Sequence, residues 1–180
     1  MAGTPVVIEV RVAELRQLFN AMDPAPFRER DLDPRAEEFI VEWARESPRD
    51  AALSLLVVLD RPSGGDDQTA LLTQAVRQFF GARALASRRR LKRLFHLGRI
   101  SLLIGVVLLA ALIGVGELLA RWTGPGRFAD ILQESLVIGG WVAMWRPLEV
   151  FLYDWWPIRG EARLHDRLAT MPVSIRYPAG

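Results

Sequence analysis

A chain of 180 residues has room for one compact domain and a few membrane helices. Just over half of the residues are apolar and 24% are charged, and the charges lie outside two apolar blocks, which excludes a uniformly hydrophobic bundle. The absence of cysteine excludes disulfides, thiol catalysis, thiolate metal sites and palmitoylation. The net charge of +2 conceals an asymmetry, because the first 67 residues are rich in acids and residues 77–99 carry only basic charges.

Residues 1–68 are predicted to form the first part of a cytoplasmic α/β domain. Residues 6–12 alternate between apolar and polar side chains, apart from Val7, which is the period of a half-buried strand. Asp33 is a good N-cap with Pro34 at the first helical position, so a helix is expected from there to about Glu46. Residues 53–60 are apolar on both faces and are expected to form the central strand of a small sheet.

Residues 69–99 are predicted to form a long basic amphipathic helix that leads to a membrane, interrupted only by tolerable glycines. The last part of this segment is a basic collar placed directly before an apolar run. We expect the collar to contact anionic lipid headgroups, at about 1 kcal/mol per basic residue near the surface. Its position beside the apolar run argues against nucleic acid as a partner. The collar consists of Arg88, Arg89, Arg90, Lys92, Arg93 and Arg99.

Residues 100–120 are predicted to be the first transmembrane helix. The run is 21 residues long and contains one charge, Glu117. At about 1.5 Å per residue, a helix of this length matches the roughly 30 Å hydrocarbon core of a bilayer. The positive-inside rule places the collar in the cytoplasm, so residues 121–127 become a periplasmic turn of a bacterial inner-membrane protein, with Trp122 at interfacial depth.

Residues 128–153 are predicted to be the second transmembrane helix. Gly139 and Gly140 lie near its middle and permit close helix packing. Pro147 leaves two geometries open: the helix continues with a kink and exits near residue 153, or it ends at Arg146 and restarts along the interface.

Charged residues within the two spans are the sharper signal, because charge at membrane depth is costly. Arg146 and Glu149 share a helix face and are expected to pair, whereas Glu117 and Glu134 fall near the outer boundary. Either Glu134, Arg146 and Glu149 line an ion or proton path around an oligomer axis, or the charges fix the depth of the spans. We favour the second interpretation, because none of them lies at the midplane. The polar residues expected in the membrane are Glu117, Glu134, Arg146 and Glu149.

Residues 154–180 are predicted to be cytoplasmic, with an amphipathic helix at about 161–169 and a short strand at 173–177 that returns to the sheet. The predicted fold class is therefore an α+β membrane protein: a two-helix transmembrane hairpin inserted in a small cytoplasmic α/β domain with a three-stranded sheet. Both termini are expected in the cytoplasm.

Catalytic chemistry has little support in the sequence. His96 and His165 are the only histidines, and neither has a carboxylate at ligand spacing, so we expect no metal, no cofactor and no catalytic residue. An enzyme that acts on lipid through His96, His165 and Asp166 is a third class of hypothesis, which we rank lowest.

Two segments have distinctive sequences: GGWVAMWRPLEVFLYDWWPIRGEARLHDRLATMPV at 139–173, and the stretch 20–43 that contains DPAPFRERDLDPRAEEFI. Together they cover about a third of the chain, and they resemble an uncharacterised family of small bacterial two-span inner-membrane proteins. The resemblance implies a cytoplasmic α/β domain on a membrane hairpin and assigns no activity. We therefore expect a non-enzymatic oligomeric scaffold or accessory subunit, with a small homo-oligomeric ion channel lined by the second span as the alternative.

Overall fold

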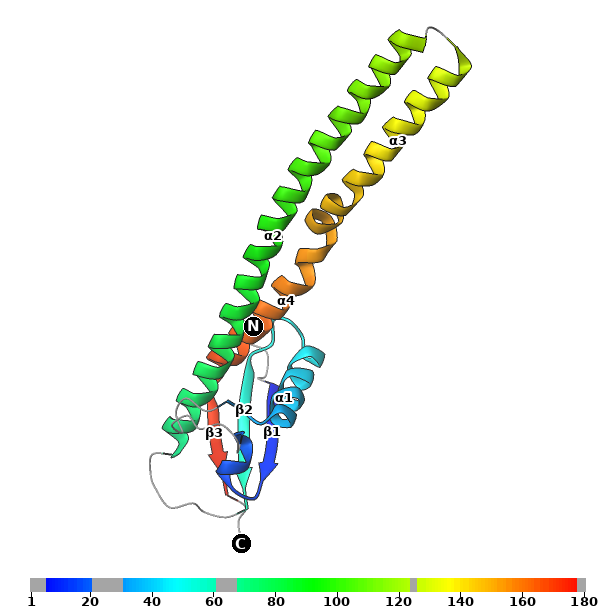
Figure 1. The fold of residues 1–180 in the computed structure, drawn as a ribbon. Coiled ribbons are helices and arrows are strands. Elements are labelled where there is room, and N and C mark those ends of the chain that lie inside the picture. Colours follow the sequence, from blue (N-terminus) through cyan, green and yellow to red (C-terminus); the bar gives the residue numbers. More distant parts are fainter. Residues whose placement is uncertain (1–5, 21–30, 61–67, 124–125, 178–180) are drawn as a thin grey trace. The chain divides into compact units, whose positions relative to one another are not determined.

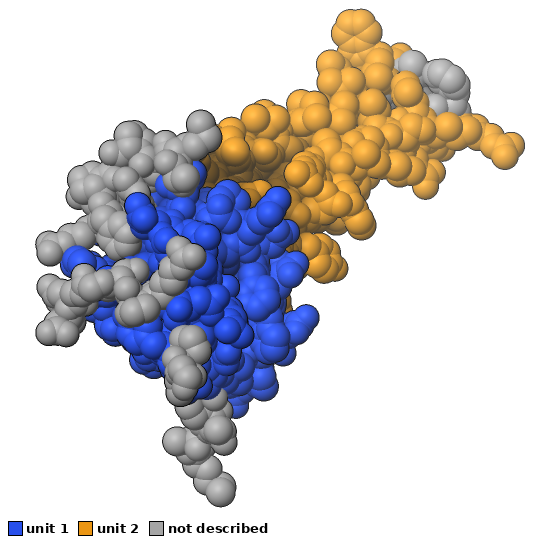
Figure 2. Space-filling view, turned by 90° about the horizontal axis from the view of Figure 1, so that it is seen from below, with its two compact units in different colours: residues 1–87, 160–180 blue, residues 88–159 orange. Residues whose placement is uncertain are grey.

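The computed structural model describes residues 6–20, 31–60, 68–123 and 126–177. The chain divides into two compact units, which Figure 2 shows in separate colours. Unit 1 comprises residues 1–87 and 160–180, and unit 2 comprises residues 88–159. Each unit is described below by itself.

Unit 1 contains a three-stranded sheet in the order β1-β2-β3, formed by β1 (Val6–Val12), β2 (Leu53–Leu59) and β3 (Val173–Arg176) (Figure 1). Both pairings are parallel, with Val10 opposite Val57 and Val57 opposite Ile175. The small three-stranded sheet predicted from the sequence is confirmed, with β2 as its central strand. The continuous apolar pattern of β2 agrees with this place, because a central strand of a parallel sheet buries residues of both faces.

Residues of the helices and of the sheet share one buried core in unit 1. Unit 1 contains α1 (Pro34–Glu46) and η1, a short 3₁₀ helix (Leu15–Leu18), and parts of α2 (Gln68–Thr123) and α4 (Trp155–Thr170). Asp33 caps α1 as predicted, its side chain accepting a hydrogen bond from the backbone N–H of Arg35 at 2.9 Å. The fully buried core residues include Ile8, Leu18, Ile40, Leu55, Val57, Leu59, Leu72, Phe80 and Leu168.

Unit 2 is an antiparallel pair of long helices (Figure 1). The helix α2 runs without a break from Gln68 to Thr123, and α3 (Arg127–Glu149) returns beside it. An ideal Cβ on Gly116 would lie 3.4 Å from Gln133 Cγ, and one on Gly105 would lie 3.1 Å from Met144 Sδ. These contacts fix the register of the pair. Of the turn predicted at 121–127, residues 121–123 belong to α2 and Arg127 begins α3, whereas residues 124–125 lie outside the described residues.

The helix continues through Pro147, which was the first of the two geometries left open by the sequence. After α3 the chain forms η3, a π-helical turn (Val150–Asp154), and passes directly into α4 at Trp155. The predicted C-terminal helix therefore starts earlier than residue 161, and Pro157 lies within its first turn, shortly after the π-helical turn. The indole N–H of Trp155 donates to the carbonyl of Phe151 at 2.9 Å, which satisfies one backbone acceptor in this altered stretch.

Candidate functional site in the apolar helix hairpin

Two helices are long and apolar enough to cross a membrane, one within residues 68–119 and the other within 130–170. Only 11% and 17% of their most apolar windows are buried, whereas the core helix of a soluble protein is mostly buried. Large apolar side chains point outward instead: Leu103 is 65% exposed, Val142 is 69% exposed and Trp122 is 83% exposed. The surface of unit 2 is therefore apolar where a water-soluble protein would be polar.

Glycines of α2 form the seam against α3. Gly98, Gly105 and Gly116 all face residues of the returning helix, with Val150 Cγ1 only 2.8 Å from an ideal Cβ on Gly98. Their spacings of 7 and 11 residues place them on one stripe, because about 18 residues make five turns of an α-helix. The sequence analysis missed this seam, because the spacing places the three glycines on one stripe but only the contacts show that the returning helix covers it.

Gly139 and Gly140, which the sequence analysis paired as packing residues, have different environments. A Cβ on Gly140 would lie 3.3 Å from Leu109 Cα and would collide with Leu109 Cδ1, so Gly140 allows α2 and α3 to approach. Gly139 has no atom within 4 Å of its Cβ position and faces outward. The side-chain direction changes by about 100° per residue in a helix, which separates neighbouring residues in this way.

Pro147 is fully buried and sits between two of the seam contacts. A proline inside a helix removes the N–H that would bond the carbonyl four residues earlier, which here belongs to Ala143. That carbonyl oxygen lies 3.6 Å from the Cβ position of Gly105. Since Gly105 has no side chain, α2 approaches closely over the carbonyl that has lost its helical partner.

A compact ionic cluster is formed by residues on both sides of Pro147 in the sequence. Arg146 Nη1 is 3.0 Å from Glu149 Oε2 and 3.7 Å from Asp154 Oδ2. The indole of Trp145 donates to the other oxygen of Glu149 at 3.2 Å. The pair of Arg146 and Glu149 was expected from the spacing, but Asp154 was not assigned a role, because only the π-helical turn brings it near Arg146.

Glu117 and Glu134, the remaining polar residues expected in the membrane, lie at the other end of the pair, near the turn. Both side chains are exposed, and neither has an ion-pair partner among residues that the structure describes. Gly116 contacts Gln133, so the two carboxylates belong to neighbouring levels of the hairpin. Both carboxylates are exposed within the single chain and need no buried counter-charge.

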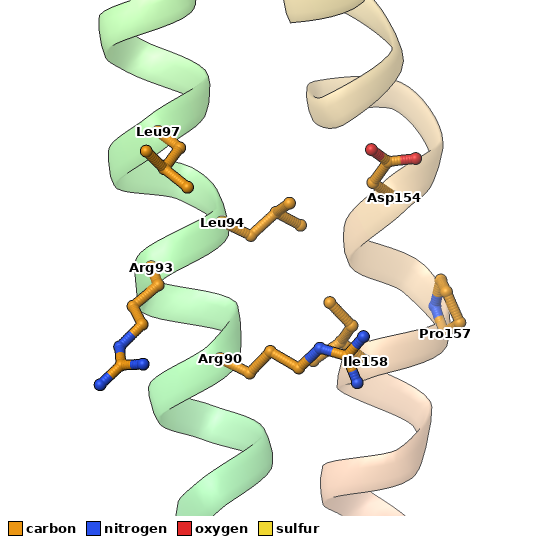
Figure 3. Close-up of a pocket in the computed structure, with 7 residues that line it drawn as sticks. All are labelled: Arg90, Arg93, Leu94, Leu97, Asp154, Pro157 and Ile158. Carbon is orange, nitrogen blue, oxygen red and sulfur yellow. The ribbon is translucent and has the colours of Figure 1, made fainter.

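The basic collar is exposed along α2, and two of its members line a groove of about 410 Å³ within unit 2. Figure 3 shows Arg90 directed across the groove toward Ile158 and Leu94 directed into the groove. The guanidinium group of Arg93 points away from the facing helix. The groove is lined by Arg90, Arg93, Leu94, Leu97, Asp154, Pro157 and Ile158. Arg88, Arg89, Lys92 and Arg99 do not line it.

A second groove, of about 350 Å³, is aromatic. The ring centroids of Phe95 and Phe151 are 6.1 Å apart, and those of Phe95 and Trp155 are 6.5 Å apart. The guanidinium of Arg159 lies over the Trp155 ring, 5.5 Å from its centroid. Aromatic rings with cationic neighbours are typical of the level where a membrane protein meets the headgroups.

The two histidines have different environments in the structure. His96 is exposed in unit 2, whereas His165 is 6% exposed in the core of unit 1, stacked on Phe80 with 6.2 Å between the ring centroids. Burial lowers the pKa of His165, and the nearby carboxylates of Glu161 and Glu37 only partly oppose this effect. Among the described residues, no three side chains of the ligand-forming types are grouped to hold a metal ion.

Comparison of the chain with known proteins found no matching family model, no matching curated protein and no matching solved structure. The fold itself defines the class: a small α/β unit whose chain is interrupted, between its second and third strands, by a pair of long apolar helices.

Proposed function

We propose that the protein is an integral membrane protein of the bacterial inner membrane that acts as a non-enzymatic oligomeric scaffold or accessory subunit. Residues 100–120 and the returning helix α3 cross the bilayer as a hairpin, and unit 1 lies in the cytoplasm with both termini. The single observation that carries this proposal is the outward apolar surface of both helices, which is 11% and 17% buried in the two apolar windows.

The distribution of charged and aromatic side chains supports the orientation. The register from the seam contacts sets Arg146 between the levels of Gly105 and Gly98, close to the start of the apolar run at Ile100. Arg146 and its two carboxylates therefore fall at the same border as the basic collar. Trp122, at the end of α2, marks the opposite border. Basic residues concentrated at one border favour a cytoplasmic location for that side.

An outward packing surface supports the oligomeric part of the proposal. Gly139 and Ser135 lie one turn apart on α3, and both are exposed within the single chain. Small residues at this spacing let two membrane helices approach closely. Unit 1 supplies a second surface, because β1 and β3 are the edge strands of its sheet and can accept a further strand from a partner.

The ion channel is the alternative. The contacts of Arg146 with Glu149 and Asp154 favour the scaffold, since the charges are neutralised within one chain and need no pore. Reconstitution of the purified chain in liposomes separates the two functions. Ion flux that is abolished by Glu134→Ala or Arg146→Ala would replace the scaffold with the channel, and absence of flux is the result we expect.

Because the chain has no cysteine, single cysteines report its topology directly. Val7→Cys marks unit 1 and Trp122→Cys marks the end of α2, and both side chains are exposed. We expect a membrane-impermeant maleimide to label Trp122→Cys in intact cells and Val7→Cys only after the inner membrane is opened. Labelling of Val7→Cys before opening, or recovery of the unmodified chain without detergent, would contradict the proposal.

A further inference from the structure

We propose that the groove lined by Arg90 and Arg93 is a binding site for one anionic phospholipid, with its phosphodiester on the guanidinium group of Arg90, which crosses the groove, and an acyl chain along Leu94 and Leu97. This inference rests on the membrane location proposed above and goes beyond it. A basic collar attracts any anionic surface, whereas a groove with polar and apolar walls selects one molecule.

The arrangement of the groove matches an amphiphile. Arg90, Arg93, Leu94 and Leu97 follow one another at helical spacing on a single face of α2. Pro157 and Ile158 form the apolar part of the opposite wall. Leu97 is 61% exposed, so the apolar wall is open to a chain from outside.

The position along α2 matches the depth of a lipid. Leu97 comes three residues before Ile100, where the apolar run starts, so the apolar end of the groove opens at the hydrocarbon boundary. Arg93 is seven residues before Ile100, which is about 10 Å along the helix axis. Figure 3 shows the Arg93 side chain directed away from Leu97, and Arg90 lies about one turn farther on that side, so the polar end of the groove lies outside this boundary.

The charges favour an anionic lipid over a zwitterionic one. Two arginines and one acidic residue, Asp154, line the groove, which leaves one net positive charge. Asp154 lies 3.7 Å from Arg146 as well, so part of its charge is already balanced. A single phosphodiester with net charge −1 neutralises the remainder, and guanidinium groups bind phosphate through paired hydrogen bonds.

The matched control is Arg89, which belongs to the same collar, is exposed and does not line the groove. The full chain is purified in a mild detergent, and binding of phosphatidylglycerol is measured against phosphatidylcholine by native mass spectrometry. We expect Arg90→Ala to weaken phosphatidylglycerol binding about tenfold, whereas Arg89→Ala changes it less than twofold. Asp154→Asn is expected to strengthen the binding, because it removes a like charge.

Three further arms keep the test decisive. Arg90→Lys keeps the charge but loses the paired hydrogen bonds, so it weakens binding even if the alanine variant fails to fold. Leu97→Asn weakens binding of the lipid, and inorganic phosphate at equal concentration does not compete. Equal losses in Arg89→Ala and Arg90→Ala, or full competition by inorganic phosphate, would overturn the lipid site.

The proposed function fails in a different way. A chain that resists carbonate extraction and still shows no difference between the Arg89 and Arg90 variants refutes the groove alone. A chain that is released by carbonate refutes the membrane location, and the lipid site with it.

Discussion

Replacement of two adjacent glycines by alanine should give opposite results, because their environments differ although their sequence positions differ by one. An alanine Cβ at position 140 would lie 3.3 Å from the Cα of Leu109 and would also force Leu109 Cδ1 to move. An alanine Cβ at position 139 would meet no atom within 4 Å. Only Gly140→Ala therefore disturbs the packing of α2 against α3.

The magnitude follows from two terms. Overpacking of a close contact costs about 1–3 kcal/mol, and the backbone atom of Leu109 cannot rotate away as a side chain can. Glycine-to-alanine replacement inside a helix contributes up to about 1 kcal/mol of stability, and both variants gain it equally. The difference between the variants is thus about 1–3 kcal/mol, with Gly140→Ala the less stable.

The assay is unfolding of the full chain in mixed micelles with increasing denaturing detergent, followed by tryptophan fluorescence. Leu109→Ala removes Cδ1 and should restore part of the loss in the double variant, so that the two substitutions are coupled. Equal stability of Gly139→Ala and Gly140→Ala would refute the register of the hairpin. A loss of oligomer mass in Gly139→Ala without loss of stability would instead support the outward packing surface.

Two predictions concern unit 1, and both are measured by hydrogen exchange of β2 amides in the full chain, with variants compared at equal pH. Burial lowers the pKa of His165 below 6.5, so the unfolded chain takes up a proton more readily. Its stability contribution is present above pH 6.5 and is lost as the pH falls below that value, whereas His165→Phe should lack this dependence. Arg167 donates to the carbonyls of Pro48 and Ala51 at 3.0 and 2.8 Å, so Arg167→Ala should cost about 1–2 kcal/mol. Arg163→Ala, which removes an exposed arginine of the same helix, should change stability by a few tenths of a kcal/mol, and an equal effect of both would contradict the role of these bonds.

The elements of unit 1 could be predicted because their signals are local. The alternation in Val6–Val12 and the continuous apolar run of Leu53–Leu59 specify an edge strand and a central strand. Asp33 followed by Pro34 specifies the start of α1. The order of the sheet could be predicted because the strand that is apolar on both faces belongs in the centre, and because the short third strand is not stable unless it pairs.

The details of unit 2 could not be predicted in the same way, because they depend on contacts between segments far apart in sequence. Gly139 and Gly140 carry the same local signal, and only the position of Leu109 on α2 distinguishes them. Proline often kinks or ends a helix, so the sequence around Pro147 does not by itself show that the helix continues. The helix α2 approaches this point through Gly105, which lies far away in the sequence. Asp154 joined the ionic cluster through a π-helical turn, which has no reliable sequence signal.

The third strand shows why a helix pair can be inserted between two strands of one sheet. β3 contains four residues and would not be stable by itself, yet it pairs in parallel with β2, and the N–H of Leu55 donates to the carbonyl of Pro172 at 2.9 Å. Parallel strands always require a crossover connection, which is commonly one helix. Here the connection from β2 to β3 includes the complete helix pair. Since the cost of closing a connection grows only with the logarithm of its length, and an antiparallel pair of helices turns the chain back on itself, inserting the hairpin adds little to the entropy lost when β3 joins the sheet.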